Sequence, residues 1–143
     1  MVEDQNFHKV KKIIYVLILF FVFASKSYSQ NFKLEKLVNL DSPWGSSFIN
    51  SNEIIVTEKS GKIKIVNILS REVQEISHQL NFVVHGQGGL LDIIHKDNNI
   101  WISYTEDRGG YKTSTSIARA EFNKKQLNFK NIFQANPPID SGY

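Results

Sequence analysis

Apolar and polar residues alternate along most of the chain after residue 30, with short runs of β-branched residues between the alternating stretches. A period of two places successive side chains on opposite faces of a strand, and no stretch of this part shows a helical stripe. Clusters of Asn, Asp, Ser and Gly separate the stretches, as they do in hairpins. The pattern predicts an all-β chain with strands over residues 32–38, 53–58, 62–68, 71–76, 90–95, 99–106, 115–122 and 127–133.

A repeat is hidden among these strands. The pair Thr57-Glu58 recurs as Thr105-Glu106, 48 residues later, in a similar sequence context. A period of roughly 40 to 50 residues with four strands per unit is typical of β-propeller blades. The first unit starts near Trp44 and continues through the strands at residues 53, 62 and 71. The second unit contains the strands that begin at residues 90, 99, 115 and 127.

Two blades do not close a propeller, which has roughly four to eight of them. The strand predicted at residues 32–38 has no place in either unit, and the ending "FQANPPIDSGY" has no terminal strand. We therefore expect residues 30–143 to form about two blades at the N-terminus of a longer, truncated propeller domain.

The first residues have the pattern of a secretory signal. Lys9, Lys11 and Lys12 precede an apolar run over residues 13–23, and small and polar residues follow up to Ser29. An uncleaved membrane anchor is the alternative, but so short a run rises only about 16 Å as a helix against a bilayer core of about 30 Å. We predict a signal peptide over residues 1–29, no stable membrane insertion after cleavage, and a periplasmic or secreted protein.

Composition and charge exclude several classes of partner. The chain is 41% hydrophobic and 22% charged, which is ordinary for a globular protein. Residues 1–29 contain four Lys and two acidic residues and so account for most of the net charge of +3. The rest of the chain is close to neutral, and no nucleic-acid partner is expected. The chain has no cysteine, so export provides no disulfide.

The stretch "FVVHGQGGLLDIIH" over residues 82–95 has three glycines around Gln87, next to His85. A phosphate-binding loop should follow a strand and open a helix, whereas these glycines precede a strand. A plain connector explains the glycines but not the two polar residues. Connectors between propeller blades lie near the mouth of the central channel, so we predict that polar side chains of this stretch face a ligand.

Several segments together resemble a known family: "LDSPWGSSF", "VTEKSGKI", "HGQGGLLDI", "NIWISYTE" and "PPIDSGY". The chain resembles the N-terminal part of the soluble PQQ-dependent aldose sugar dehydrogenases of the glucose/sorbosone dehydrogenase family. The Gly-Gln-x-Gly-Leu-Leu core is the most specific of these motifs. The resemblance implies a six-bladed propeller and an exported oxidoreductase that binds PQQ and calcium and oxidises aldose sugars at the anomeric carbon to lactones.

The resemblance also implies where the reactive groups lie. Gln87 matches the family glutamine that contacts the pocket, and its amide can both donate and accept hydrogen bonds. The catalytic base is a histidine in a His-x-Gly-Gly-Arg motif, expected directly after Tyr143. The PQQ clamps and the calcium ligands are also expected beyond this chain. We therefore expect no catalytic residue and no metal ligand in residues 1–143, and an inactive fragment.

The histidines and the nearby acidic residues have more ordinary interpretations. For His85 a structural role within the connector is favoured, and a supporting role at the mouth of the channel is the alternative. Asp92, His95 and Asp97 alternate along a strand and make no convincing metal site. The remaining histidines are expected to be solvated or locally hydrogen-bonded: His8 in the signal, His78 in a polar loop and His95 at a strand end.

Trp44 and Trp101 lie in apolar strand patterns, which favours blade core over sugar-stacking platforms. Glu58 and Glu106 occupy equivalent repeat positions, which favours a shared structural role over paired catalytic carboxylates. A non-catalytic exported propeller that binds a ligand or partner protein is the alternative function, because a fold alone does not define an activity. The sequence does not identify the preferred sugar or the electron acceptor.

Overall fold

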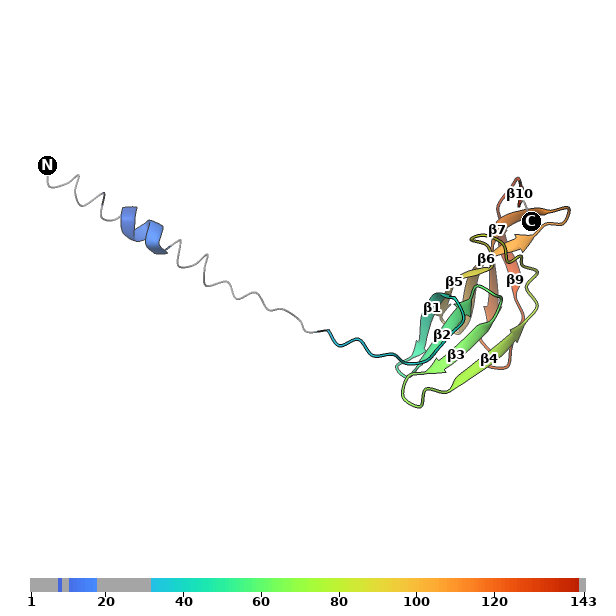
Figure 1. Cartoon of the computed structure of the whole chain (residues 1–143), viewed down its shortest axis with the longest axis horizontal. Helices are drawn as coiled ribbons and strands as arrows, with labels where there is room; N and C mark the ends of the chain where they lie inside the picture. Colours follow the sequence, from blue (N-terminus) through green and yellow to red (C-terminus); the bar gives the residue numbers. More distant parts are fainter. Residues whose placement is uncertain (1–7, 9–10, 18–31, 142–143) are drawn as a thin grey trace. The chain divides into compact units, whose positions relative to one another are not determined.

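A computed structural model describes residues 8, 11–17 and 32–141 of the chain (Figure 1). The chain divides into two compact units, Met1–Glu35 and Lys36–Tyr143. In the first unit, His8 and residues 11–17 are helical. No helix among the described residues is long and apolar enough to cross a membrane. The predicted cleavage position after Ser29 lies outside the described residues, so the signal peptide stays a prediction.

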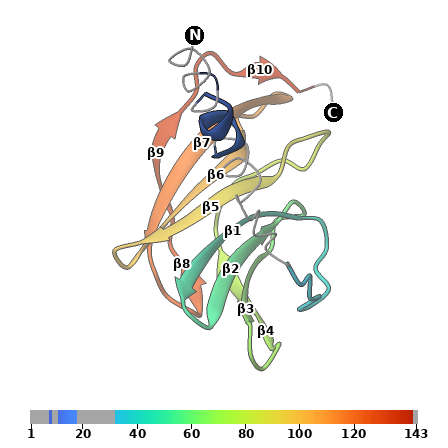
Figure 2. The ribbon, with the colours of Figure 1, turned by 90° about the vertical axis from the view of Figure 1, so that its left-hand side faces the viewer.

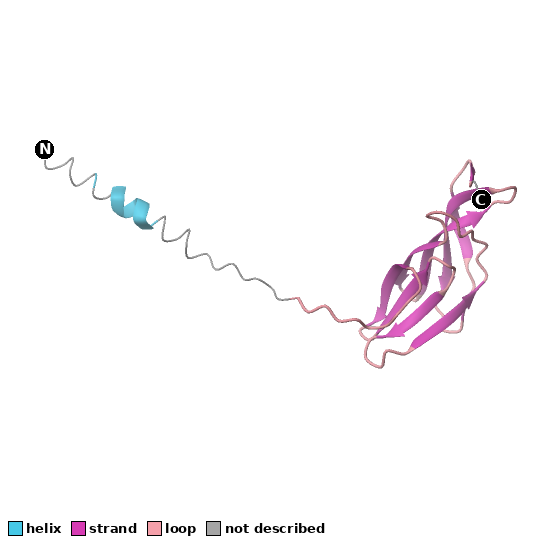
Figure 3. Ribbon diagram, in the orientation of Figure 1, coloured by secondary structure: helices cyan, strands magenta, loops and turns pink. Residues whose placement is uncertain are grey.

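The second unit is built from strands and connecting loops, which confirms the predicted all-β class (Figure 3). The longer strands follow the alternating segments of the sequence closely, and β6 shows the reason because it buries every second side chain. In chain order they are β1 (Pro43–Asn50), β2 (Glu53–Glu58), β3 (Ile63–Asn67), β4 (Val73–His78), β5 (Leu90–Lys96), β6 (Asn99–Asp107), β7 (Lys112–Glu121), β8 (Gln126–Leu127), β9 (Lys130–Gln134) and β10 (Ile139–Asp140).

The strands form two sheets of five strands each (Figure 2). The first has the order β1-β2-β3-β4-β8, and the second has the order β10-β7-β6-β5 with β9 also paired to β7. Strands β1 to β4 form one antiparallel meander, and β5, β6, β7 and β9 form another. Each meander is the four-stranded unit expected of a propeller blade.

Three predictions about the strands are wrong. Residues 32–40 form no strand and have no strand partner within residues 32–141, and the side chains of Phe32 and Leu34 are 89% and 100% exposed. Alternation alone does not make a strand, since the backbone also needs a paired neighbour. The strand predicted over residues 127–133 is divided, because β8 pairs in parallel with β4 while β9 pairs with β7. Strand β10 occupies an ending that was expected to lack a strand.

The core lies between the two sheets, where β1 and β2 contact β5. Along β6, Ile100, Ile102 and Tyr104 are buried while the residues between them are partly exposed. The first sheet contributes Ile55, Ile63, Ile65 and Ile76 to this core, and β5 of the second sheet contributes Leu90 and Ile93. Sheet-on-sheet packing therefore stabilises this unit by removing apolar side chains from water.

Both tryptophans lie outside this core, so their predicted core positions are wrong. Trp44 is 47% exposed. Trp101 alternates with the buried isoleucines of β6 and therefore faces the other side of the sheet, where the Arg119 guanidinium lies 5.8 Å from its ring centroid. An apolar residue in a strand is buried only if its face is the covered one.

The β1–β2 hairpin and the β5–β6 hairpin show which residues of the two blades are equivalent, and they do so more exactly than the Thr-Glu pairs. Pro43 pairs with Glu58 and Leu90 pairs with Tyr104, and a bulge follows each pair. Tyr104 is therefore the counterpart of Glu58 in this register, and the predicted equivalence of Glu58 and Glu106 is wrong. Strand β6 has nine residues against six in β2, so the second Thr-Glu pair lies further from its hairpin turn.

Candidate functional site

The glycine-rich connector joins the two sheets between His78, the last residue of β4, and Leu90, the first residue of β5. It borders a hollow of about 450 Å³ that the end of β6, the start of β7 and the segment around β10 also line. Gln87 and His85 both line this hollow, and both are exposed. The structure thus brings the two residues singled out in the sequence to one hollow, which apolar side chains such as Leu91 and Ile139 also line.

Each glycine of the connector has a geometric reason. Gly86 and Gly89 have positive φ angles of +51° and +146°, which side chains rarely adopt. A Cβ atom on Gly89 would lie only 2.3 Å from the carbonyl oxygen of Lys59. A Cβ atom on Gly88 would lie 3.0 Å from the His85 carbonyl oxygen and 3.1 Å from the Thr105 hydroxyl, which is closer than side chains usually approach. The Gly88 N–H donates to the same His85 carbonyl at 2.6 Å and closes a tight turn around Gln87. The glycines therefore shape the loop that presents Gln87.

Both sheets hold this connector in place. From the first sheet, the Lys59 ammonium donates to the Gly86 carbonyl, and the Thr57 hydroxyl donates to the Leu91 carbonyl at 2.5 Å. From the second sheet, the Thr105 N–H donates to the Gly89 carbonyl at 2.9 Å. Backbone groups on both sides of Gln87 are thus fixed by residues far away in the sequence.

The Gln87 side-chain amide has no hydrogen-bond partner among residues 32–141. An exposed amide beside a hollow can offer two N–H donors and a carbonyl acceptor to a ligand. His85 borders the same hollow from the other end of the turn. Their predicted binding roles agree with these positions and stay predictions.

The facing wall contains polar residues that the sequence did not single out. Thr105 and Thr115 are paired across β6 and β7, and both line the hollow. Asp140 and Ser141 line it from the last described segment, where Ser141 donates from its N–H and its hydroxyl to the Tyr111 carbonyl at 2.9 and 2.6 Å. Pairing the two long predicted strands could have found the threonines, whereas no signal indicated that β10 would pair with β7.

A buried polar cluster around Glu106 supports this wall. The Glu106 side chain belongs to a residue only 9% exposed, and it accepts from Ser116 at 2.6 Å, Asn131 at 2.8 Å and Gln134 at 2.7 Å. The Tyr104 hydroxyl donates to the Asn131 side chain at 2.6 Å, while burial, with the nearby Glu106 charge, raises the pKa of Tyr104. The cluster holds β9 against β6 and β7, just before the chain turns to β10.

Glu58 is held in a similar way in the first sheet. Its fully buried carboxylate accepts from the Asp41 N–H and from the Lys64 ammonium, each at 2.7 Å. Burial favours the neutral acid, but the hydrogen bonds from Lys64 and Asp41 outweigh it and lower the pKa of Glu58 below its ordinary value. Both glutamates thus act as structural acceptors, as predicted, although they are not register equivalents.

The other histidines make local contacts. Leu80 N–H donates to His78 Nδ1 at 3.3 Å, so Nε2 carries the proton that bonds to the Gly61 carbonyl at 2.7 Å. The His95 ring packs edge-on against Phe122 at 5.1 Å. No group of three His, Cys, Asp or Glu residues in the described part of the chain could hold a metal ion.

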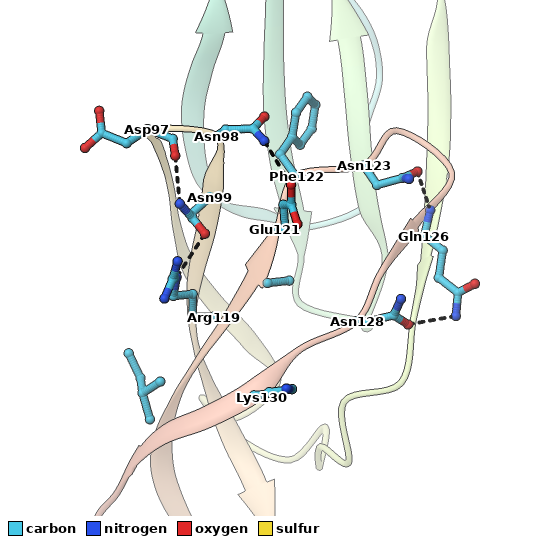
Figure 4. A pocket seen from close by; sticks show the side chains of 12 residues that line it. Asp97, Asn98, Asn99, Arg119, Glu121, Phe122, Asn123, Gln126, Asn128 and Lys130 are labelled. Atoms are coloured by element: carbon cyan, nitrogen blue, oxygen red, sulfur yellow. Dashed lines mark hydrogen bonds between the residues drawn. The ribbon is translucent and has the colours of Figure 1, made fainter.

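A larger groove of about 840 Å³ lies at the opposite end of the second sheet, beside the β5–β6 turn (Figure 4). Its polar side chains largely bond to one another: Asn99 donates to the Asp97 carbonyl at 2.7 Å, and Arg119 donates to the Asn99 side chain at 2.9 Å. Gln126 likewise donates to Asn128 at 3.1 Å. Neither Gln87 nor His85 lines this groove, so we place the candidate site at the connector.

Comparison with known proteins identifies the family of the chain. The sequence profile of the family described as Glucose / Sorbosone dehydrogenase matches residues 40–143, a range that includes the connector and both sheets. The aldose sugar dehydrogenase YliI of Escherichia coli is 26% identical over 112 residues, which cover 72% of this chain and 30% of the relative. This chain therefore spans less than a third of the length of that relative.

Solved structures show the same fold. The apo form of the soluble aldose sugar dehydrogenase of Escherichia coli superposes with a TM-score of 0.64 at 25% identity, over 69% of this chain and 31% of that one. The PQQ-bound aldose sugar dehydrogenase of Streptomyces coelicolor gives a TM-score of 0.60 at 21% identity, over 69% and 32% of the two chains. These neighbours are propellers, so the two meanders are propeller blades.

Proposed function

Because the chain belongs to the glucose/sorbosone dehydrogenase family, we propose that the full-length protein is an exported, PQQ-dependent aldose dehydrogenase. One observation carries the proposal: the family match contains the Gly-Gln-Gly-Gly connector, and this connector presents Gln87 to the hollow. The non-catalytic alternative is not favoured, because the relatives described above are named as sugar dehydrogenases.

The proposed reaction removes two electrons and two hydrogens from the sugar. The anomeric C–H bond breaks with its electron pair leaving as hydride, the anomeric hydroxyl loses a proton to a base, and the product is a lactone. PQQ, when bound, would supply the acceptor for the hydride. The base is expected after Tyr143. Gln87 would hydrogen-bond a sugar hydroxyl or a cofactor oxygen and orient the two reactants.

The residues around the hollow fit part of this task. Gln87, Thr105, Thr115 and Ser141 supply neutral donors and acceptors, and Asp140 supplies an acceptor. Among the described lining residues there is no lysine or arginine, although PQQ carries three carboxylates. This chain would therefore bind oxygen atoms of the cofactor or sugar, while the cationic clamps and any calcium ligands would come from the remainder of the protein.

The proposed location is the periplasm or the exterior, after cleavage of the signal predicted over residues 1–29. There the enzyme would meet free aldoses and pass electrons to an acceptor that these residues do not identify. The test is oxidation of an aldose by the purified full-length protein, measured as dye reduction and as lactone formation. We expect both to require PQQ, and a folded protein that forms no lactone with PQQ and calcium present would refute the enzymatic assignment.

A further inference from the structure

The peptide that joins Gly86 to Gln87 is fixed on one side. The Lys59 ammonium, from the turn between β2 and β3, donates to the Gly86 carbonyl oxygen. Gly86 and Gln87 line the hollow, whereas Lys59 does not. Lys59 therefore holds this peptide by its carbonyl without lining the hollow that the peptide borders.

The other end of the same peptide is a free donor. The peptide between Gly86 and Gln87 is trans, so its N–H points opposite to its carbonyl and away from Lys59. The Gln87 N–H finds no acceptor within residues 32–141. A charged donor on the carbonyl polarises the peptide and makes its N–H a stronger donor.

Lys59 is itself held firmly at its backbone. Its N–H donates to the Ser42 carbonyl at 3.1 Å, and the adjoining turn is closed by the Gly61 N–H on the Glu58 carbonyl at 2.9 Å. The backbone of Gly89 approaches the Lys59 carbonyl so closely that a side chain there would collide with it. The turn between β2 and β3 thus packs against the connector and fixes its position.

We propose that Lys59 is a positioning residue that aims the Gln87 main-chain N–H, beside the Gln87 side chain, at an oxygen atom of the bound ligand. The ligand atom is a carbonyl, hydroxyl or carboxylate oxygen, which belongs either to the cofactor or to the sugar. This inference rests on the proposed function, because that function supplies the ligand. It adds a main-chain donor and a distant lysine to the predicted role of the Gln87 side chain.

The test compares Lys59→Met and Lys59→Arg in the full-length protein. Lys62→Met is the matched control, since Lys62 belongs to the same turn but its ammonium pairs with the exposed Glu75, at 3.8 Å, and not with the connector. Without ligand, we expect Lys59→Met to speed hydrogen exchange of the Gly88 N–H, which closes the turn on His85, while Lys59→Arg and Lys62→Met leave it near the wild-type rate. Equal melting temperatures would show that all the variants are folded.

Titrations with two ligands show whether the Gln87 N–H binds an oxygen of the cofactor or of the sugar. PQQ alone, and then glucose added to the PQQ-loaded protein, are titrated while exchange of the Gln87 N–H is followed. We expect one of them to protect this N–H, and Lys59→Met to weaken that ligand about tenfold through its Kd or KM, as for the loss of a charge-assisted hydrogen bond. Lys59→Arg should recover most of the affinity.

Two results would overturn the proposal: unchanged Gly88 exchange in Lys59→Met, or a Gln87 N–H that neither ligand protects although both bind. A wild-type protein that binds neither PQQ nor sugar would instead refute the proposed function, and with it the ligand role of the N–H. The exchange of Gly88 in the free protein would still decide whether Lys59 positions the connector.

Discussion

Thr57 of the first sheet is hydrogen-bonded to Leu91 of the second, which lines the hollow, and Thr57→Val tests this link between the sheets. Its hydroxyl accepts from the Gly45 N–H at 3.0 Å and donates to the Leu91 carbonyl at 2.5 Å, and the residue is fully buried. Gly45 and Leu91 both lie in bulges, where the regular ladder of their strand is interrupted. The hydroxyl therefore replaces ladder partners that neither backbone group has.

The expected cost follows from these contacts. Valine has nearly the same shape as threonine, so the change leaves no cavity but strips two buried backbone groups of their partner. Each unsatisfied group costs about 1–3 kcal/mol, and we expect a loss of about 2–4 kcal/mol in the free energy of unfolding. Thr57→Ser keeps the hydroxyl and removes one methyl group, which costs about 1 kcal/mol.

The assay is denaturant unfolding of the full-length protein, with Thr115→Val at an exposed position as the control. Hydrogen exchange of the Gly45 N–H provides a local measurement of the same bond. The expected order of stability is wild type, then Thr57→Ser, then Thr57→Val. If Thr57→Val were as stable as Thr57→Ser or more stable, hydrophobic burial would dominate at this position and the hydrogen-bonded link would be refuted.

Two further predictions concern the same region. Gly89→Ala should destabilise the protein by about 3 kcal/mol in denaturant unfolding, because Gly89 has a positive φ and a Cβ atom there would clash with Lys59. Gly86→Ala has open space around the new methyl group and should cost only about 1 kcal/mol. Equal losses in the two variants would argue against the close approach of Gly89 to Lys59. Glu58 has a lowered pKa, so its stabilisation is complete above its ordinary pKa of 4.5 and is lost as the pH falls through the lower folded value. Lys64→Met should make that acid loss shallower in unfolding midpoints measured from about pH 3 to 6, and an unchanged slope would contradict the assigned role of Lys64.

The strands of the fold could be predicted because burial follows alternation. Ile100, Ile102 and Tyr104 recur every second residue and all three face the core. Residues 32–38 show a similar pattern and yet form no strand, because alternation says nothing about whether a partner strand exists. The burial of Trp101 could not be predicted for a similar reason, since the sequence does not reveal which face of β6 is covered.

The candidate site was predictable only where a local motif marked it. Glycines around a polar residue indicated a shaped connector, and Gln87 does lie at a hollow. Asp140 and Lys59 depend on tertiary pairing. Asp140 reaches the hollow because β10 pairs with β7, whereas Lys59 reaches the Gly86 carbonyl because the turn between β2 and β3 lies against the connector. Contacts between segments so distant in sequence leave no periodic signal in the chain.

The proposed function requires that the hollow at the glycine connector binds the reactants of a PQQ-dependent sugar oxidation. The most direct test is kcat/KM for aldose oxidation by full-length Gln87→Ala, beside Gln126→Ala in the groove at the other end of the second sheet. We predict that Gln87→Ala loses about ten- to hundredfold, as for a lost hydrogen bond to a polar or charged oxygen, while Gln126→Ala stays at the wild-type value. Equal kcat/KM in both variants would contradict a binding role for the hollow.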